Sequence, residues 1–178
     1  MTPFSKNTRT SQASGTDADG GPDTTAAIGP ATLAQVSAAE RFIVQGVRMV
    51  VHGTTLAVLE RLARPMMSAG ASDLAAEGVV HLVRALDDAE GPQIRLRRPQ
   101  CAKLEDDERV ILRFVSALAR QDLEAAQIYG DLLVSPTHLP RLIHAGRSLV
   151  ATLTAEQARF TCHSPVPVVA WSYQEAAE

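Results

Sequence analysis

The chain has 178 residues, of which 46% are apolar and only 4% aromatic, and its formal net charge is −3. This length fits a single domain of about 140 residues once a polar N-terminal stretch is set aside. A core with few aromatic residues favours closely packed helices over a β-sandwich, and the negative net charge excludes a general attraction to nucleic acid or anionic lipid. We therefore expect a soluble all-α protein, a compact bundle of about six helices.

The expected cellular compartment is inferred from the lack of a signal peptide and of a membrane span in the sequence. There is no signal-peptide pattern at the start, and the nearest approach to a membrane span, residues 42–51, is interrupted by Gln45 and Arg48. The two cysteines allow at most one disulfide. Arg far outnumbers Lys and Ala is abundant, as in GC-rich bacterial genes. We expect a cytoplasmic bacterial protein with no membrane segment.

Residues 1–30 are rich in Ser, Thr, Gly, Asp and Pro and poor in large apolar side chains. Such a segment cannot bury enough apolar surface to offset the entropy lost on ordering. The sequence therefore predicts a disordered N-terminal tail over residues 1–30 and a single helical domain over residues 31–178.

Three helices are predicted before residue 90. The first spans residues 32–52, with Thr32 as its N-cap, because its apolar residues follow helical spacing. The second spans residues 55–64 and ends before Pro65. The third begins near Ser72 or Asp73 and runs to Asp88.

A short extended segment follows at residues 93–98, where apolar and polar side chains alternate as in a strand. Its best partner is the β-prone run at residues 166–171, which Pro167 would restrict to an edge position. The sequence thus allows a small two-stranded β-ribbon beside the bundle.

The central helix has the clearest start in the chain. Residues 105–108 are four consecutive carboxylates, and negative charge is favoured at the positive end of the helix dipole. They point in different directions from a helix, so they are read as helix capping and not as a metal site. The predicted buried stripe of this helix consists of Ile111, Phe114, Val115 and Leu118.

Two more helices complete the predicted bundle. The fifth runs over residues 122–134, and its predicted inner face consists of Leu123, Ala126, Tyr129 and Leu133. The sixth begins after Thr137 as N-cap, with Pro140 in the first turn, where the missing N–H has no helical partner. Its predicted buried stripe consists of Leu142, Ile143, Leu149, Val150 and Leu153.

Ligand-type residues are few. Cys101, Cys162 and His163 would come together, with His81 or His144, only if the two extended segments paired. There is no C-x-x-C motif, no nucleophile motif and no phosphate loop. We expect no catalytic residue, cofactor or metal, and an enzyme or metal protein using Cys101, Cys162 and His163 is the second alternative.

The only dense group of cations consists of Arg95, Arg97, Arg98 and Lys103. Such a group can contact a carboxylate, a phosphate or an acidic partner, although a solvated surface is the simpler interpretation.

Residues 104–149 resemble the C-terminal helix-turn-helix of sigma factors. The positions that carry the resemblance are Leu104, Glu108, Leu112, Ala126 and Gly130. It implies a DNA-binding regulator using residues 104–153, which is the first alternative. The would-be recognition helix contains Pro140 and has only Arg141 and Arg147 as cations, so nucleic acid is not the expected partner.

These patterns favour a non-enzymatic protein that acts by protein–protein association, as an adaptor or regulatory module. The partner is expected to be another protein, and self-association stays open.

Overall fold

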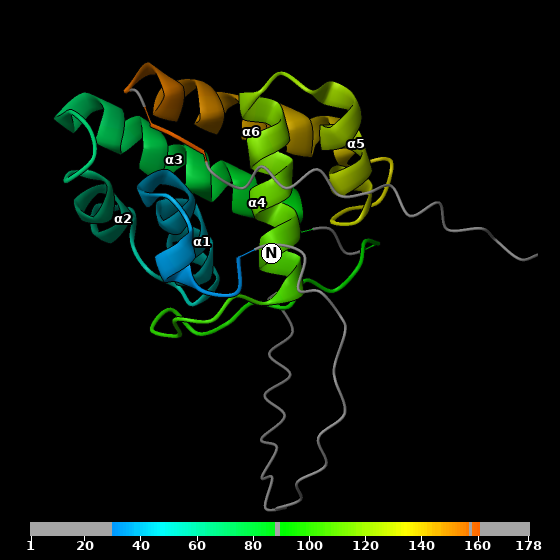
Figure 1. Ribbon diagram of the computed structural model, residues 1–178, viewed down its shortest axis with the longest axis horizontal. Coiled ribbons are helices and arrows are strands. Elements are labelled where there is room, and N and C mark those ends of the chain that lie inside the picture. Colours follow the sequence, from blue (N-terminus) through cyan, green and yellow to red (C-terminus); the bar gives the residue numbers. More distant parts are fainter. Residues whose placement is uncertain (1–29, 88–89, 157, 161–178) are drawn as a thin grey trace, which may run out of the picture.

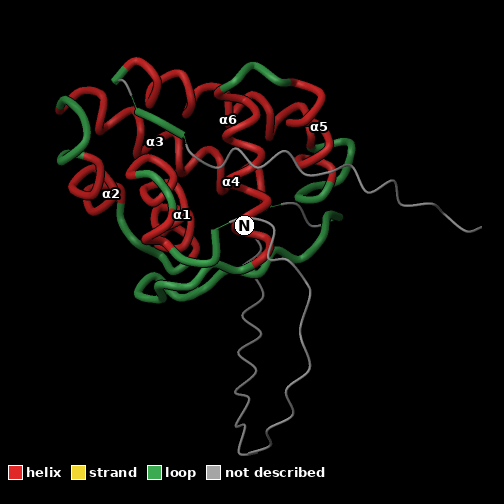
Figure 2. Tube along the Cα trace, viewed as in Figure 1, coloured by secondary structure: helices red, strands yellow, loops and turns green. Residues whose placement is uncertain are grey.

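The computed structural model describes residues 30–87, 90–156 and 158–160. These residues form six α-helices and one turn of 3-10 helix, and no strand occurs among them (Figures 1 and 2). The elements are η1 (Leu33–Gln35), α1 (Ala38–Val51), α2 (Leu56–Ala63), α3 (Ala69–Leu86), α4 (Asp106–Ala119), α5 (Leu123–Asp131) and α6 (Leu139–Ala155). The prediction of an all-α bundle of about six helices is confirmed.

Four helices share one interior. α3 and α6 make the most extensive helix pair, and α4 crosses in front of them (Figure 1). α1 packs on α3, while α2 lies at one end of the bundle and α5 at the other. Within the residues described, no helix has both the length and the apolar character needed to cross a bilayer.

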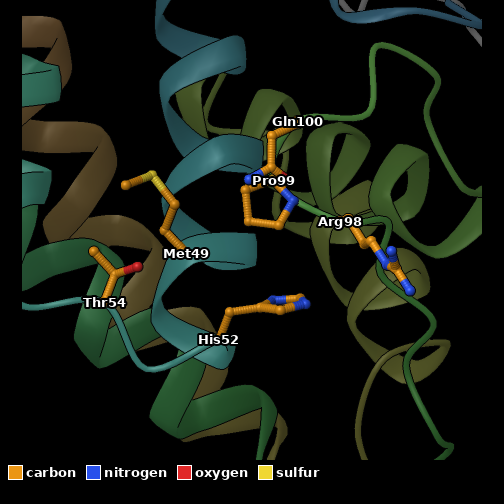
Figure 3. A pocket seen from close by; sticks show the side chains of 6 residues that line it. All are labelled: Met49, His52, Thr54, Arg98, Pro99 and Gln100. Carbon is orange, nitrogen blue, oxygen red and sulfur yellow. The ribbon is translucent and has the colours of Figure 1, made fainter. Parts of the chain in front are cut away.

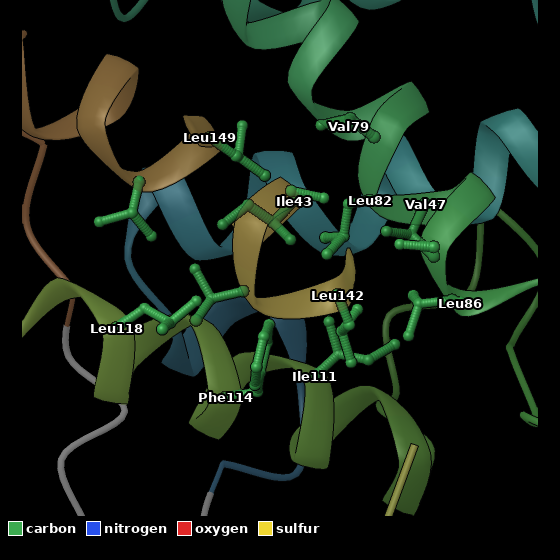
Figure 4. Packing of buried hydrophobic residues seen from close by; sticks show 14 of the residues in the cluster. Ile43, Val47, Val79, Leu82, Leu86, Ile111, Phe114, Leu118, Leu142 and Leu149 are labelled. Carbon is green, nitrogen blue, oxygen red and sulfur yellow. The ribbon is translucent and has the colours of Figure 1, made fainter. Parts of the chain in front are cut away.

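The core lies where α1, α3, α4 and α6 meet (Figure 4). Every residue of the stripe predicted for α4 is buried, and in α6 only Ile143 of the predicted stripe is half-buried. The largest apolar side chains with under 2% exposure include Phe42, Phe114, Leu82, Leu142 and Leu149. Aliphatic side chains thus fill a core that holds few aromatic rings.

The start of the first predicted helix is wrong by six residues. Thr32 caps only the short η1, whereas α1 begins at Ala38 with Ser37 as its N-cap. Ser37 Oγ accepts a hydrogen bond from the Glu40 N–H at 3.2 Å, and Glu40 Oε2 accepts one from the Ser37 N–H at 2.8 Å. This reciprocal capping box fixes the helix start, although helical apolar spacing continues upstream of it.

Other predicted boundaries also shift. α3 begins at Ala69, ahead of Ser72, whose hydroxyl donates to the Ala69 carbonyl at 2.6 Å from inside the helix. α6 has His138 and not Thr137 as its N-cap, with Pro140 in its first turn as predicted. α5 ends at Asp131, three residues before the predicted end, and Leu123 is exposed instead of belonging to the inner face.

The predicted strand at residues 93–98 is a loop. The N–H groups of Arg95 and Arg97 donate to the side-chain carboxylates of Asp107 and Glu108, at 2.6 and 2.9 Å. Because α4 supplies these acceptors, the alternating backbone donors need no neighbouring strand. Residues 166–171, the proposed ribbon partner, lie outside the described residues, as do residues 1–29.

Candidate functional site

The loop that carries the basic group is built around a buried ion pair between α1 and α4. Arg48 and Glu108 are 0% and 1% exposed, and Arg48 Nε lies 2.6 Å from Glu108 Oε1. A second hydrogen bond of 2.6 Å joins Arg48 Nη2 to Glu108 Oε2. The pair is therefore bidentate, the strongest arrangement for Arg and a carboxylate.

Both partners of this pair also bind the loop backbone. Arg48 Nη1 donates to the carbonyls of Cys101 and Arg98, at 2.6 and 3.4 Å, and Nη2 donates to that of Lys103 at 2.8 Å. Glu108 accepts from the N–H groups of Arg97 and Glu105 as well as from Arg48. The buried charges thus fix the course of the loop, and with it the positions of the exposed side chains on that loop.

The four cations of the predicted contact group have different surroundings. Arg97 pairs with Glu105 at the N-cap of α4. The side chains of Arg95, Arg98 and Lys103 are exposed and form no ion pair with another described residue. Three free cations therefore face solvent, and a role for them in binding an anion or a partner stays a prediction.

Arg98 also lines a shallow hollow of about 370 Å³ between the end of α1 and the loop (Figure 3). The six residues that line it include no carboxylate, and they are Met49, His52, Thr54, Arg98, Pro99 and Gln100. His52 is the C-cap of α1, and its Nδ1 lies 2.7 Å from the Arg48 carbonyl oxygen.

A carbonyl oxygen can only accept a hydrogen bond, so His52 Nδ1 carries a hydrogen and donates it to the Arg48 carbonyl. Thr54 and Arg98 lie at opposite ends of the hollow in Figure 3, with the imidazole between them. No nucleophile is hydrogen-bonded to a base among these six side chains.

The proposed metal or redox cluster is not assembled by the described residues. Cys101 is half-buried, while Cys162 and His163 lie outside the described part of the chain. His81 and His144 are exposed on α3 and α6. Across residues 30–87, 90–156 and 158–160, no group of three or more His, Cys, Asp and Glu side chains could hold a metal ion.

The helix-turn-helix alternative corresponds to α4, α5 and α6. The exposed face of α6 carries Arg141, His144 and Arg147, and the helix contains no Asp or Glu. Residues 132–138 separate α5 from α6, a connection longer than the three to four residues usual in this motif. α5 carries the exposed carboxylates Glu124 and Asp131, which would repel the phosphate backbone.

An exposed apolar surface lies on α5, at the end of the bundle opposite α2 (Figure 1). Leu123, Ile128 and Leu132 are 41%, 52% and 60% exposed. Ile128 and Leu132 are four positions apart and share one face of the helix, and we call these two residues the α5 patch, whereas Leu123 lies on the opposite side of α5. Isolated exposed apolar residues are ordinary, but two large ones one turn apart on the same face of a short helix form a small surface.

Sequence reasoning missed both the buried ion pair and the α5 patch. Arg48 follows the apolar Val44 by four residues and so lies on the same face of α1. A charged residue at such a position was the sequence signal that could have predicted a buried charge. In α5, helical spacing placed Leu123 on the same face as Ala126. Ala126 is buried and Leu123 is exposed, and no feature of the sequence predicts that difference.

No protein family model, no curated protein and no solved structure matches this chain. Its function is therefore argued from the surfaces described above.

Proposed function

We propose that this protein acts by protein association, as a cytoplasmic adaptor or regulatory module and not by catalysis. The α5 patch is the proposed contact surface. The supporting observation is the exposure of Ile128 and Leu132 on one face of a short helix, in a bundle whose other large apolar side chains are mostly buried. Covering such side chains with a partner removes apolar area from water, which favours association.

The proposal is tested by photo-cross-linking in a lysate of the organism that encodes the protein. A photoreactive amino acid replaces Gln127, which is exposed on α5 directly before Ile128. We expect defined protein adducts that disappear when Ile128→Ser and Leu132→Ser are combined, because the apolar contact is lost.

The matched control is Leu74→Ser on α3, where a leucine of 58% exposure lies on another helix. This variant should keep the adducts. Adducts that persist in the double variant, or vanish equally in the control, would contradict the proposed surface.

DNA binding is the second candidate, because the exposed face of α6 is basic and the helix has no carboxylate. The same experiment separates the two functions when the photoreactive group replaces His144 instead of Gln127. Nucleic acid cross-linked at position 144, with no protein adduct at position 127, would favour the helix-turn-helix function.

A further inference from the structure

We propose that the partner of the α5 patch is a basic amphipathic helix. It would present apolar side chains three or four positions apart, with Lys or Arg beside them. This inference rests on the proposed function and adds the chemistry of the partner.

The charge around the patch is of one sign. Residues 121–140 contain three carboxylates and neither Lys nor Arg. Asp122 caps α5 by accepting a hydrogen bond from the Ala125 N–H at 3.0 Å, so its charge has a local role. Glu124 and Asp131 are exposed and form no ion pair with a described residue.

Asp131 does not stabilise its own helix. It is the last residue of α5, where the negative end of the helix dipole disfavours a carboxylate. Its charge therefore destabilises α5 in the isolated protein, and it would attract a cationic side chain of a partner.

The spacing places charge and apolar surface side by side. Ile128 and Leu132 are four positions apart, and Leu132 keeps a helical backbone as the C-cap. Glu124 lies one turn before Ile128, and Asp131 follows Glu124 by two turns, so the carboxylates run along the apolar pair. A helix lying along the roughly 13 Å of α5 could cover both rows at once.

Other occupants are disfavoured by the same charges. Two copies packed face to face through α5 would bring the carboxylates of Glu124 and Asp131 of one copy close to those of the other. An anionic membrane surface or a nucleic acid would meet the same repulsion. A cationic helix is the occupant that satisfies both the apolar and the charged rows.

The test uses two defined helical peptides with the same leucines at positions i, i+3, i+4 and i+7, one flanked by Lys and one by Glu. Binding to the full chain is followed by NMR chemical-shift titration. We expect the Lys-flanked peptide to bind, with shifts concentrated on α5, and the Glu-flanked peptide not to bind. Raising the salt from about 0.05 M to about 0.5 M should weaken binding.

The variant E124Q/D131N should raise the Kd of the Lys-flanked peptide about fivefold, the scale expected for two exposed ion pairs. The control variant D73N/E77Q removes two exposed carboxylates from α3 and should leave the Kd unchanged. Equal Kd values for the two variants, equal binding of the two peptides, or no binding of either would overturn the inference.

The outcome for the proposed function is read separately, from the adducts at position 127. If protein adducts form there but their cross-linked segments are acidic or neutral, protein association would stand and a basic partner would be rejected. A self-adduct at that position would assign the patch to a second copy and also reject it.

Discussion

At the scale of single residues, Arg48 is the most constrained side chain among those described. Its guanidinium has five N–H groups, and five acceptor contacts surround it: two oxygens of Glu108 and the carbonyls of Arg98, Cys101 and Lys103. Replacing both residues of such a buried pair by apolar residues usually lowers the free energy of unfolding little, if at all. Removing one partner is different, because the other charge and three carbonyl groups then lose their donors.

Arg48→Met should therefore lower the free energy of unfolding by roughly 3 to 5 kcal/mol, because Glu108 would stay buried without its counter-charge. The control is Arg97→Met in the same loop, whose ion pair with Glu105 is 47% exposed on the Arg side and screened by solvent. It should cost less than about 1 kcal/mol. Denaturant unfolding of both variants measures the difference, and equal losses would show that the buried pair does not hold the loop.

At the scale of helices, two glycines set how closely α6 approaches its neighbours. A Cβ added at Gly146 would lie 2.5 Å from Leu118 Cδ1 and 2.8 Å from Phe114 Cε1 on α4. A Cβ at Gly78 on α3 would lie 3.3 Å from the Cα of Leu149 on α6. Small residues at these crossings let the backbones and the Phe114 ring approach closely, so α6 can pack on α3 and α4 at once.

Gly146→Ala should destabilise the fold by about 1 to 3 kcal/mol, the usual cost of overpacking a core, despite the better helix propensity of Ala. Gly70→Ala is the matched control, because Gly70 lies in α3 and has no atom within 4 Å of an added Cβ. That control should be neutral or stabilise by up to about 1 kcal/mol. Thermal melts of the two variants shifting in the same direction would contradict the close α4–α6 contact.

Sequence patterns predicted a helix most accurately where separate signals agreed. The apolar stripe and acidic first turn of α4 were both predicted, because periodicity and capping agree there. The start of α1 was missed because the capping motifs of Thr32 and Ser37 follow each other within six residues. The alternation at residues 93–98 was read as a strand because the carboxylates that bind Arg95 and Arg97 come from a separate element. The basic contact group was visible in the sequence, whereas the buried pair that positions it depends on a tertiary contact.

At the scale of the whole molecule, the bundle has a main core and a smaller second cluster. The second cluster joins η1 to α1 and α4 through Leu33, Val36, Val44, Leu104 and Leu112. The chain before α1 is also tied to the loop before α4, since the Leu33 N–H donates to the Ala102 carbonyl at 2.8 Å. The Leu104 N–H donates to the Ala31 carbonyl at 2.9 Å. The folded unit therefore includes the segment from Ala31 onward, upstream of the first α-helix.

These contacts and the composition of residues 1–29 predict different outcomes for two truncations. Removing residues 1–29 should leave the melting temperature within about 1 °C, because their composition offers no apolar face for the core. Removing residues 1–36 also deletes Leu33 and Val36, each worth roughly 1.5 to 3 kcal/mol when buried, but keeps the Ser37–Glu40 cap of α1. We expect a fall in melting temperature of roughly 10 to 20 °C for this shorter chain. Circular dichroism melts compare the two truncated chains. A similar fall in melting temperature for both would place part of residues 1–29 in the folded unit. No fall for either would show that the second cluster adds nothing to stability.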